Sequence, residues 1–176
     1  MTSRVVLDAP DIDRALKRIS HEILEANEGS QDLVLLGIPT RGIALANRIG
    51  AMLSSIDPNF TGQVGSLDIT LYRDDLSNQE RQIRTTEIPA EGIENKVVVL
   101  VDDVLFSGRT VRAALDALTE FGRPRQVKLA VMVDRGHREL PIRPDFVGKN
   151  LPTAKAERVS VQLSEVDGVD QVVIGE

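Results

Sequence analysis

Apolar residues along this chain follow two spacings, one typical of helices and one typical of buried strands. Residues 11–27 carry isoleucine, leucine and alanine at helical spacing behind Pro10, and Gly29 follows as a stop signal, which predicts an amphipathic helix. Short continuous apolar runs predict strands that are buried on both faces. The expected strands are residues 33–36, 64–71, 96–101, 127–133, 158–163 and 171–174, and the further expected helices are residues 43–53 and 110–121.

The order of these elements predicts the fold class. Strands that alternate with helices indicate an α/β fold with a doubly wound, mostly parallel sheet flanked by helices. Residues 72–89 are polar and without sustained periodicity, so we expect a long mobile loop, which in a compact domain is usually functional. Residues 134–155 are rich in proline, glycine and basic residues, and they precede the last two strands. The length predicts a single domain over residues 1–176.

Composition excludes several classes of protein. The chain has no cysteine, so disulfides, thiolate metal sites and thiol nucleophiles are unavailable. No apolar run approaches the roughly 20 residues that span a bilayer, and the amino terminus does not resemble a signal peptide. We therefore expect a cytoplasmic protein with no membrane partner. A net charge of −6 disfavours indiscriminate binding to polyanions but leaves room for a local basic face.

The most informative stretch is residues 98–110, Val-Val-Leu-Val-Asp-Asp-Val-Leu-Phe-Ser-Gly-Arg-Thr. It predicts a buried strand, a loop at the carboxyl edge of the sheet, and a helix that begins at Thr110. The amides of residues 105–110 can surround an anion, and Gly108 allows close approach. Asp102 and Asp103 would repel a phosphate unless they accept hydrogen bonds from sugar hydroxyls or face a cation. A ribose 5-phosphate meets both conditions, so we expect both carboxylates to face a ligand and not the core.

A second glycine-bounded loop, residues 37–42 (Gly-Ile-Pro-Thr-Arg-Gly), follows the first predicted strand and precedes a helix. It should face the same edge of the sheet, where its amides and Arg41 make a second anion site. No Gly-Lys-Ser/Thr ends it, so it is not the P-loop of nucleoside triphosphatases. An ordinary strand-to-helix turn is the alternative for this motif alone.

Residues 98–110 resemble the phosphoribosyl pyrophosphate (PRPP) signature of the type I phosphoribosyltransferases. The resemblance implies that the acidic pair contacts the ribose 2- and 3-hydroxyls, that the loop holds the 5-phosphate, and that Thr40 and Arg41 contact pyrophosphate. A receiver domain, the rival, should carry its acidic pair on its first strand, whereas this pair comes past the middle of the chain. The implied contacts to PRPP or UMP are Thr40, Arg41, Asp102, Asp103, Val104, Leu105, Phe106, Ser107, Gly108, Arg109 and Thr110.

Catalysis in such an enzyme depends on the leaving group. Departure of pyrophosphate leaves an oxocarbenium-like ribose, so Mg²⁺ and arginines supply the stabilisation. Arg73 and Arg84 of the long loop are the candidate leaving-group contacts, with Arg81 nearby; a solvated charged loop is the equal alternative. We expect Mg²⁺ to enter with PRPP, and its protein ligands are not identified by the sequence. The candidate catalytic residues are Asp102, Asp103, Arg41, Arg73 and Arg84.

Residues 68–76, 134–141 and 147–153 narrow the resemblance to the PyrR family, bifunctional pyrimidine operon regulators and uracil phosphoribosyltransferases. The likeness runs from the first helix to the last strand, and the loop after Leu76 departs from it. It implies conversion of uracil and PRPP to UMP and pyrophosphate with Mg²⁺, on a type I phosphoribosyltransferase fold with a small hood. It also implies a homo-oligomer, a dimer or higher, and uracil held largely by backbone groups near Arg135 and Val159.

The same resemblance implies that the protein binds a stem-loop of the pyrimidine operon leader RNA when UMP occupies the active site. Basic residues of the first helix and the tail could form that surface. The candidates are Lys17, Arg18, His21, His137, Arg138, Arg143 and Lys149, with Lys155 nearby. Scattered solubilising charge is the alternative, because the chain has few aromatics for stacking on bases. The rival functions are another salvage or orotate phosphoribosyltransferase without an RNA role, and a regulator that binds UMP without turnover.

Overall fold

The centre of the molecule is a five-stranded parallel sheet with strand order β3-β2-β4-β5-β6, seen in a computed structural model that describes residues 2–74 and 83–176. Its strands are β2 (Leu33–Gly37), β3 (Val64–Ser66), β4 (Val97–Leu105), β5 (Gln126–Asp134) and β6 (Phe146–Asn150). Strands β2 and β4 are buried along most of their length, as expected of a sheet covered on both faces. The predicted doubly wound, mostly parallel sheet is confirmed.

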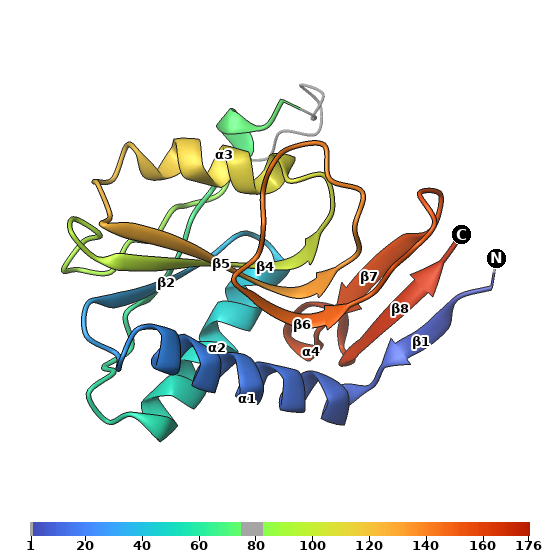
Figure 1. Cartoon of the computed structure of the whole chain (residues 1–176), viewed down its shortest axis with the longest axis horizontal. Helices are drawn as coiled ribbons and strands as arrows, with labels where there is room; N and C mark the ends of the chain where they lie inside the picture. Colours follow the sequence, from blue (N-terminus) through green and yellow to red (C-terminus); the bar gives the residue numbers. More distant parts are fainter. Residues whose placement is uncertain (1, 75–82) are drawn as a thin grey trace.

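Helices cover both faces of the sheet (Figure 1). On one face lie α1 (Ala9–Ala26) and α2 (Arg41–Ile56); on the other lie α3 (Arg109–Leu118) and the short 3₁₀ helix η1 (Thr70–Tyr72). Helix α1 begins where it does because Asp8 and Asp11 form a reciprocal capping box. Each face has its own apolar core. In the described residues, no helix is long and apolar enough to cross a membrane.

The ends of the described chain form a separate antiparallel sheet, the hood, with strand order β1-β8-β7. It consists of β1 (Arg4–Leu7), β7 (Arg158–Gln162) and β8 (Gln171–Gly175), and the one-turn helix α4 (Ser164–Asp167) joins its last two strands. In Figure 1 the hood stands beside the carboxyl ends of the central strands. The two closing strands expected at residues 158–163 and 171–174 therefore belong to this hood and not to the main sheet.

Three local predictions were incomplete. Strands β1 and β6 were not predicted, because each has a short apolar run, and β6 includes Gly148, which packs so closely on β5 that an added Cβ would lie 2.5 Å from the Met132 carbonyl oxygen. The strand expected over residues 64–71 ends at Ser66. Beyond it, the Asp68 carboxylate accepts hydrogen bonds from the amide and hydroxyl of Thr70, which turns the chain into η1.

Candidate functional site

The site lies at the point where the winding of the sheet reverses. Strands β2 and β4 are neighbours, yet the helices that follow them, α2 and α3, lie on opposite faces. Open α/β sheets bind ligands at such a switch point, beyond the carboxyl ends of the strands. Two loops meet here. We call residues 38–40 the first loop and residues 106–108 the signature loop.

Direct backbone contact fixes the first loop against β4. The Ile38 amide donates to the Val101 carbonyl at 2.9 Å, and a Cβ on Gly42 would lie 2.4 Å from the same oxygen. Only glycine permits this approach. The start of α2 is thereby held against the residue that precedes Asp102.

The signature loop ends in an uncapped helix. Gly108 is the N-cap of α3 with φ of 94° and has no side chain that could cap the helix, while the Ser107 hydroxyl accepts the Arg109 amide at 3.3 Å. Within the described residues, the amides of Ser107, Gly108 and Thr110 have no acceptor. Free amides at a helix N-terminus bind anions through both hydrogen bonds and the helix dipole. This geometry fits the phosphate cradle predicted for residues 105–110.

The segment after β5 holds the signature loop through hydrogen bonds to its carbonyls. The Ser107 carbonyl accepts from the amides of Glu139 and Leu140 at 2.9 and 3.1 Å. The Arg138 guanidinium donates to the Phe106 carbonyl at 3.0 Å and pairs with Asp134 at 2.6 Å. Arg138, an RNA-binding candidate, therefore also has an internal role in holding the signature loop.

The first loop leads into a second uncapped helix. Thr40 is the N-cap of α2 without a side-chain hydrogen bond, and the peptide between Pro39 and Thr40 is cis. In residues 2–74 and 83–176, the amides of Thr40, Arg41 and Gly42 find no acceptor. Because β2 and β4 are adjacent, this second set of amides lies beside the first.

Arg41 does not project freely from this loop. Its guanidinium forms a bidentate pair with Asp167 of α4, with Nε at 3.1 Å and Nη2 at 2.7 Å from the carboxylate oxygens. The hydrogen bonds that Arg41 donates to Asp167 raise the pKa of Arg41, and the negative charges of Asp167 and Asp103 raise it further. Arg41 thus lies between the hood and the acidic pair.

The acidic pair occupies two different environments. Asp103 is partly exposed, whereas Asp102 is only 7% exposed. Asp102 is therefore largely withdrawn from solvent within β4, and the expectation that both carboxylates face a ligand stays a prediction. Burial, followed by the nearby charge of Asp103, raises the pKa of Asp102 well above its usual range, and the charge of Arg73 opposes the rise. Both carboxylates accept a main-chain amide, Asp102 from Asp103 at 2.9 Å and Asp103 from Val104 at 2.8 Å.

The three candidate arginines beyond Arg41 are placed differently. Arg73 is half-buried and acts electrostatically on Asp102. Arg109 pairs with Asp74 at 2.9 Å and with Glu139 at 3.5 Å, so it bridges the start of the long loop and the signature segment. Arg84 is exposed, and its main-chain amide donates to Asp68. Arg81 lies outside the described residues.

A pocket of about 370 Å³ opens where β5 and β6 end. It is lined by Asp134, Arg135, Gly136, His137, Asn150, Leu151, Pro152 and Thr153. This is where the resemblance implies that the acceptor base is held. Val159 does not line this pocket; it lies in β7, half-buried against the core.

Arg135 itself is engaged with the protein. Its guanidinium stacks 4.2 Å from the Phe106 ring centroid and donates to Thr153 and Ala154. Its amide donates to the Leu105 carbonyl, and its carbonyl accepts from the Thr153 hydroxyl. These contacts leave a second lone pair of that carbonyl and further guanidinium donors, such as those on Nη1, so Arg135 holds the wall of the pocket and still has groups that could meet a base.

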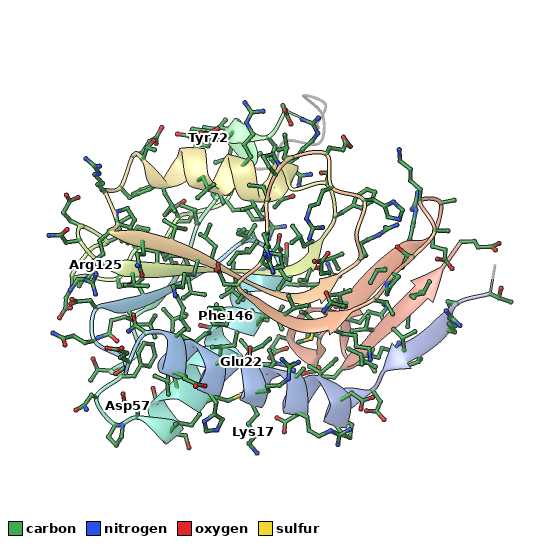
Figure 2. The ribbon with its side chains drawn as sticks, in the orientation of Figure 1. Lys17, Glu22, Asp57, Tyr72, Arg125 and Phe146 are labelled. Atoms are coloured by element: carbon green, nitrogen blue, oxygen red, sulfur yellow. The ribbon has the colours of Figure 1, made fainter. Side chains whose placement is uncertain are left out.

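The basic candidates lie on different sides of the molecule around the β6 edge of the sheet: Lys17 and His21 line a groove between α1 and α2, whereas Arg143 lies beside α3. Arg18 donates to the carbonyls of Val147 and Gly148 at 3.1 and 2.7 Å, which joins α1 to β6. His21 and Lys149 are exposed on these two elements, and Figure 2 shows Lys17 pointing away from the sheet. Arg143 is exposed just before β6. His137 is exposed beside the pocket, and its Nε2 lies 2.6 Å from the Thr153 carbonyl oxygen.

The acidic partners of the arginines on α2 were not predicted. Arg48, two turns after Arg41, forms bidentate pairs with both Glu165 and Asp170 of the hood. These partners lie more than one hundred residues away in the chain. The seven-residue spacing of the two arginines, which places them on one helical face, was the only signal available.

Comparison with known proteins identifies the family. The model of the phosphoribosyl transferase domain matches residues 4–165. The Bifunctional protein PyrR of Streptomyces coelicolor is 62% identical over 98% of this chain and 90% of the relative, and that of Bacillus velezensis is 57% identical over 98% and 96%. The chain belongs to the PyrR family of phosphoribosyltransferases. The predicted resemblance is confirmed.

Solved structures agree with this family at the level of the fold. A hypoxanthine phosphoribosyltransferase from Staphylococcus aureus has a TM-score of 0.67 at 20% identity, covering 85% of this chain and 77% of that one. The corresponding enzyme from Trypanosoma cruzi has a TM-score of 0.72 at 18% identity, covering 98% and 91%. This PyrR family member therefore has the type I phosphoribosyltransferase fold that its signature predicts.

The buried acid generates a stability prediction. The pKa of Asp102 is higher in the folded protein than in the unfolded chain. Below the unfolded pKa the carboxyl is protonated in both states and does not lower the free energy of unfolding. As the pH rises from the unfolded pKa to the folded one, the free energy of unfolding falls. Asp102→Asn removes this titration. We expect the variant to melt roughly 2–4 °C above wild type at pH 7, the shift produced by about 1 kcal/mol in a protein of this size. Calorimetric melts from about pH 4 to about pH 8 measure it.

Asp103→Asn is the matched control, because it removes a neighbouring carboxylate that is partly exposed. Because the Asp103 charge is one cause of the raised pKa of Asp102 and burial is the larger one, its melting temperature should still fall as the pH rises, but less steeply than that of wild type. Equal effects of both substitutions would contradict the assignment of the pH dependence to burial of Asp102.

Proposed function

We propose that the protein is a UMP-responsive, RNA-binding regulator of pyrimidine biosynthesis genes that also converts uracil and PRPP to UMP and pyrophosphate. One observation carries the enzymatic half. Two uncapped helix N-termini lie side by side at the switch point, with an acidic pair on the strand between the loops. PRPP has the matching groups: a phosphate, a pyrophosphate and a ribose between them. Membership in the PyrR family supports both halves.

Each part of the site then has a task. The amides of Ser107, Gly108 and Thr110 bind the 5-phosphate, and those of the first loop bind pyrophosphate together with Arg41. Asp103 accepts hydrogen bonds from the ribose hydroxyls, and Asp102 fixes the strand beneath it through the Asp103 amide. Arg73 adds positive charge beside the acidic pair. Fixed donors of this kind stabilise the charge that develops on a leaving group.

Mg²⁺ is the cofactor of this proposal and enters with PRPP. Bound there, it neutralises charge on the departing pyrophosphate. Among the described residues, no group of three or more acidic or histidine side chains could hold a metal. That fits an ion bound mainly by substrate oxygens and water with at most one or two carboxylates, of which Asp103 is the partly exposed candidate.

The regulatory half places a leader RNA stem-loop on the basic residues at the β6 edge. Lys149 is exposed on β6 itself, Arg143 is exposed just before it on the α3 side, and Lys17 and His21 are exposed on α1. UMP is both product and signal. Its phosphate binds the signature loop, and Arg138 connects that loop to the segment that leads into β6. A homo-oligomer in the cytoplasm, where PRPP and leader transcripts occur, completes the proposal.

The enzymatic proposal is tested by removing the acidic pair. Asp102→Asn with Asp103→Asn should abolish most uracil-dependent pyrophosphate release while the protein stays folded. The Asp103 change removes the charge-assisted hydrogen bonds to the ribose hydroxyls, each worth roughly 1.5–3 kcal/mol, and the Asp102 change alters the support beneath Asp103. Turnover with uracil, orotate and hypoxanthine also separates this function from that of the rival transferases. Unchanged kinetics would sink the assignment, and UMP binding without turnover in wild type would favour the binding-only regulator.

Arg41 should distinguish the two nucleotides. Arg41→Ala should weaken PRPP binding much more than UMP binding, because UMP has no pyrophosphate for the first loop to hold. Parallel calorimetric titrations of the two ligands decide the matter. Equal losses would mean that Arg41 supports the fold or a contact common to both ligands.

The RNA surface is tested by its salt dependence. Arg143→Gln with Lys149→Gln should weaken binding of a pyrimidine-operon stem-loop and reduce the slope against salt by about one unit or less per lost phosphate contact. Uracil turnover should stay near that of wild type. UMP should tighten RNA binding, and RNA should tighten UMP binding by the same factor. Filter binding across a salt series, with and without UMP, measures both effects.

A charge-matched control lies at the amino-terminal ends of the central strands. Arg123 and Arg125 are exposed near the start of β5, and Figure 2 labels Arg125 there, far from the hood. Replacing both by glutamine should leave the salt slope unchanged. If the two double variants behave alike, the β6 edge is only a solvated surface.

A further inference from the structure

Two arginines of α2 are bound by one short acidic segment of the hood, residues 164–170, which we call the hood loop. Arg41 pairs with Asp167, and Arg48 pairs with Glu165 and Asp170. All three pairs are bidentate, and the hood loop contacts one helical face over two turns. The carboxylates are themselves fixed, since Asp167 accepts the Leu163 amide at 2.9 Å and Asp170 accepts the Ser164 amide at 2.7 Å.

The two arginines differ in how many of their donors the hood loop uses. Arg48 lies in the second turn of α2, and its Nε, Nη1 and Nη2 all donate to the hood loop. Arg41 lies at the first residue of α2 and gives only Nε and Nη2 to Asp167. In the described part of the chain, its Nη1 has no partner. A guanidinium is a rigid planar fork, so fixing one edge also fixes the direction of the remaining donors.

We propose that Asp167 is a positioning residue, which holds the Arg41 guanidinium so that its remaining donors are set for the pyrophosphate of PRPP. This rests on the pyrophosphate role proposed for Arg41. The side chains of this pair are 32% and 19% exposed, so solvent only partly competes with it. The influence of Asp103 on the pKa of Arg41 places the guanidinium within electrostatic reach of the ribose side of the site. The hood is thus part of the PRPP site through Asp167.

The alternative is that Asp167 competes with PRPP for the Arg41 guanidinium. If Asp167 only neutralised Arg41, removing it would free a cation and tighten PRPP binding. If Asp167 positions Arg41, removing Asp167 should weaken PRPP binding. The guanidinium would then be free to rotate in the unbound protein and would lose that rotamer entropy when PRPP binds. The sign of the change in PRPP affinity therefore separates the two roles.

The experiment compares Asp167→Ala, Asp167→Asn and Arg41→Ala in the full chain. We expect Asp167→Ala to raise the KM for PRPP and the Kd of inorganic pyrophosphate by about tenfold, the scale of one charge-assisted hydrogen bond, with UMP affinity unchanged. Asp167→Asn should recover part of the loss, because its amide oxygen still accepts one hydrogen bond. The double variant with Arg41→Ala should bind PRPP no worse than Arg41→Ala alone, since Asp167 acts through Arg41.

Glu165→Gln is the matched control, because it weakens a bidentate pair between the same helix and the same loop at Arg48. It should lower the melting temperature without changing the KM for PRPP. Equal kinetic losses in Glu165→Gln and Asp167→Ala, additive losses in the double variant, or tighter PRPP binding would each overturn the inference. A wild-type chain that binds PRPP but has no turnover would refute the proposed enzyme alone, whereas one that binds neither PRPP nor pyrophosphate would refute both.

Discussion

The backbone contact between the start of α2 and β4 is the constraint on which the site depends. Gly42 lies against the Val101 carbonyl with no room for a Cβ, and Ile38 donates to the same oxygen. Two adjacent parallel strands can send their helices to opposite faces and still bring both helix N-termini together only if the loops pack this closely. The two adjacent helix N-termini, the acidic pair between them and the attachment of the hood all follow from this approach.

Asp102 illustrates how such a site departs from what stability alone would select. A carboxyl in the middle of a buried strand is costly, and its raised pKa is the sign of that cost. The surrounding sheet, with its continuous apolar strands, provides enough stability to tolerate it. The carboxylates of the hood loop are stabilised in their charged form, since Glu165, Asp167 and Asp170 each pair with an arginine that lowers their pKa.

Much of the molecule could be predicted from local sequence. The buried strands, the helix after each of them and both glycine-bounded loops produce signals within a few residues, as does the signature at residues 98–110. The hood contacts could not be predicted in this way, because Arg41 and Asp167 meet across 126 residues of chain, and either side chain alone resembles ordinary surface charge. The burial of Asp102 was missed for a related reason. Strand alternation separates the faces of neighbouring residues, whereas a motif treats the acidic pair as one unit.

Arg138 complicates the genetics of any protein built this way. Its guanidinium holds the Phe106 carbonyl, the Asp134 carboxylate and the Ile142 carbonyl, so one side chain links the signature loop to the segment that leads into the edge strand. A screen for mutants that lose regulation would recover Arg138 substitutions with either of two defects, weaker RNA binding or a disturbed nucleotide site. Such alleles therefore cannot map a surface by themselves. Alleles of Lys149, which is exposed on the same edge, are free of that ambiguity.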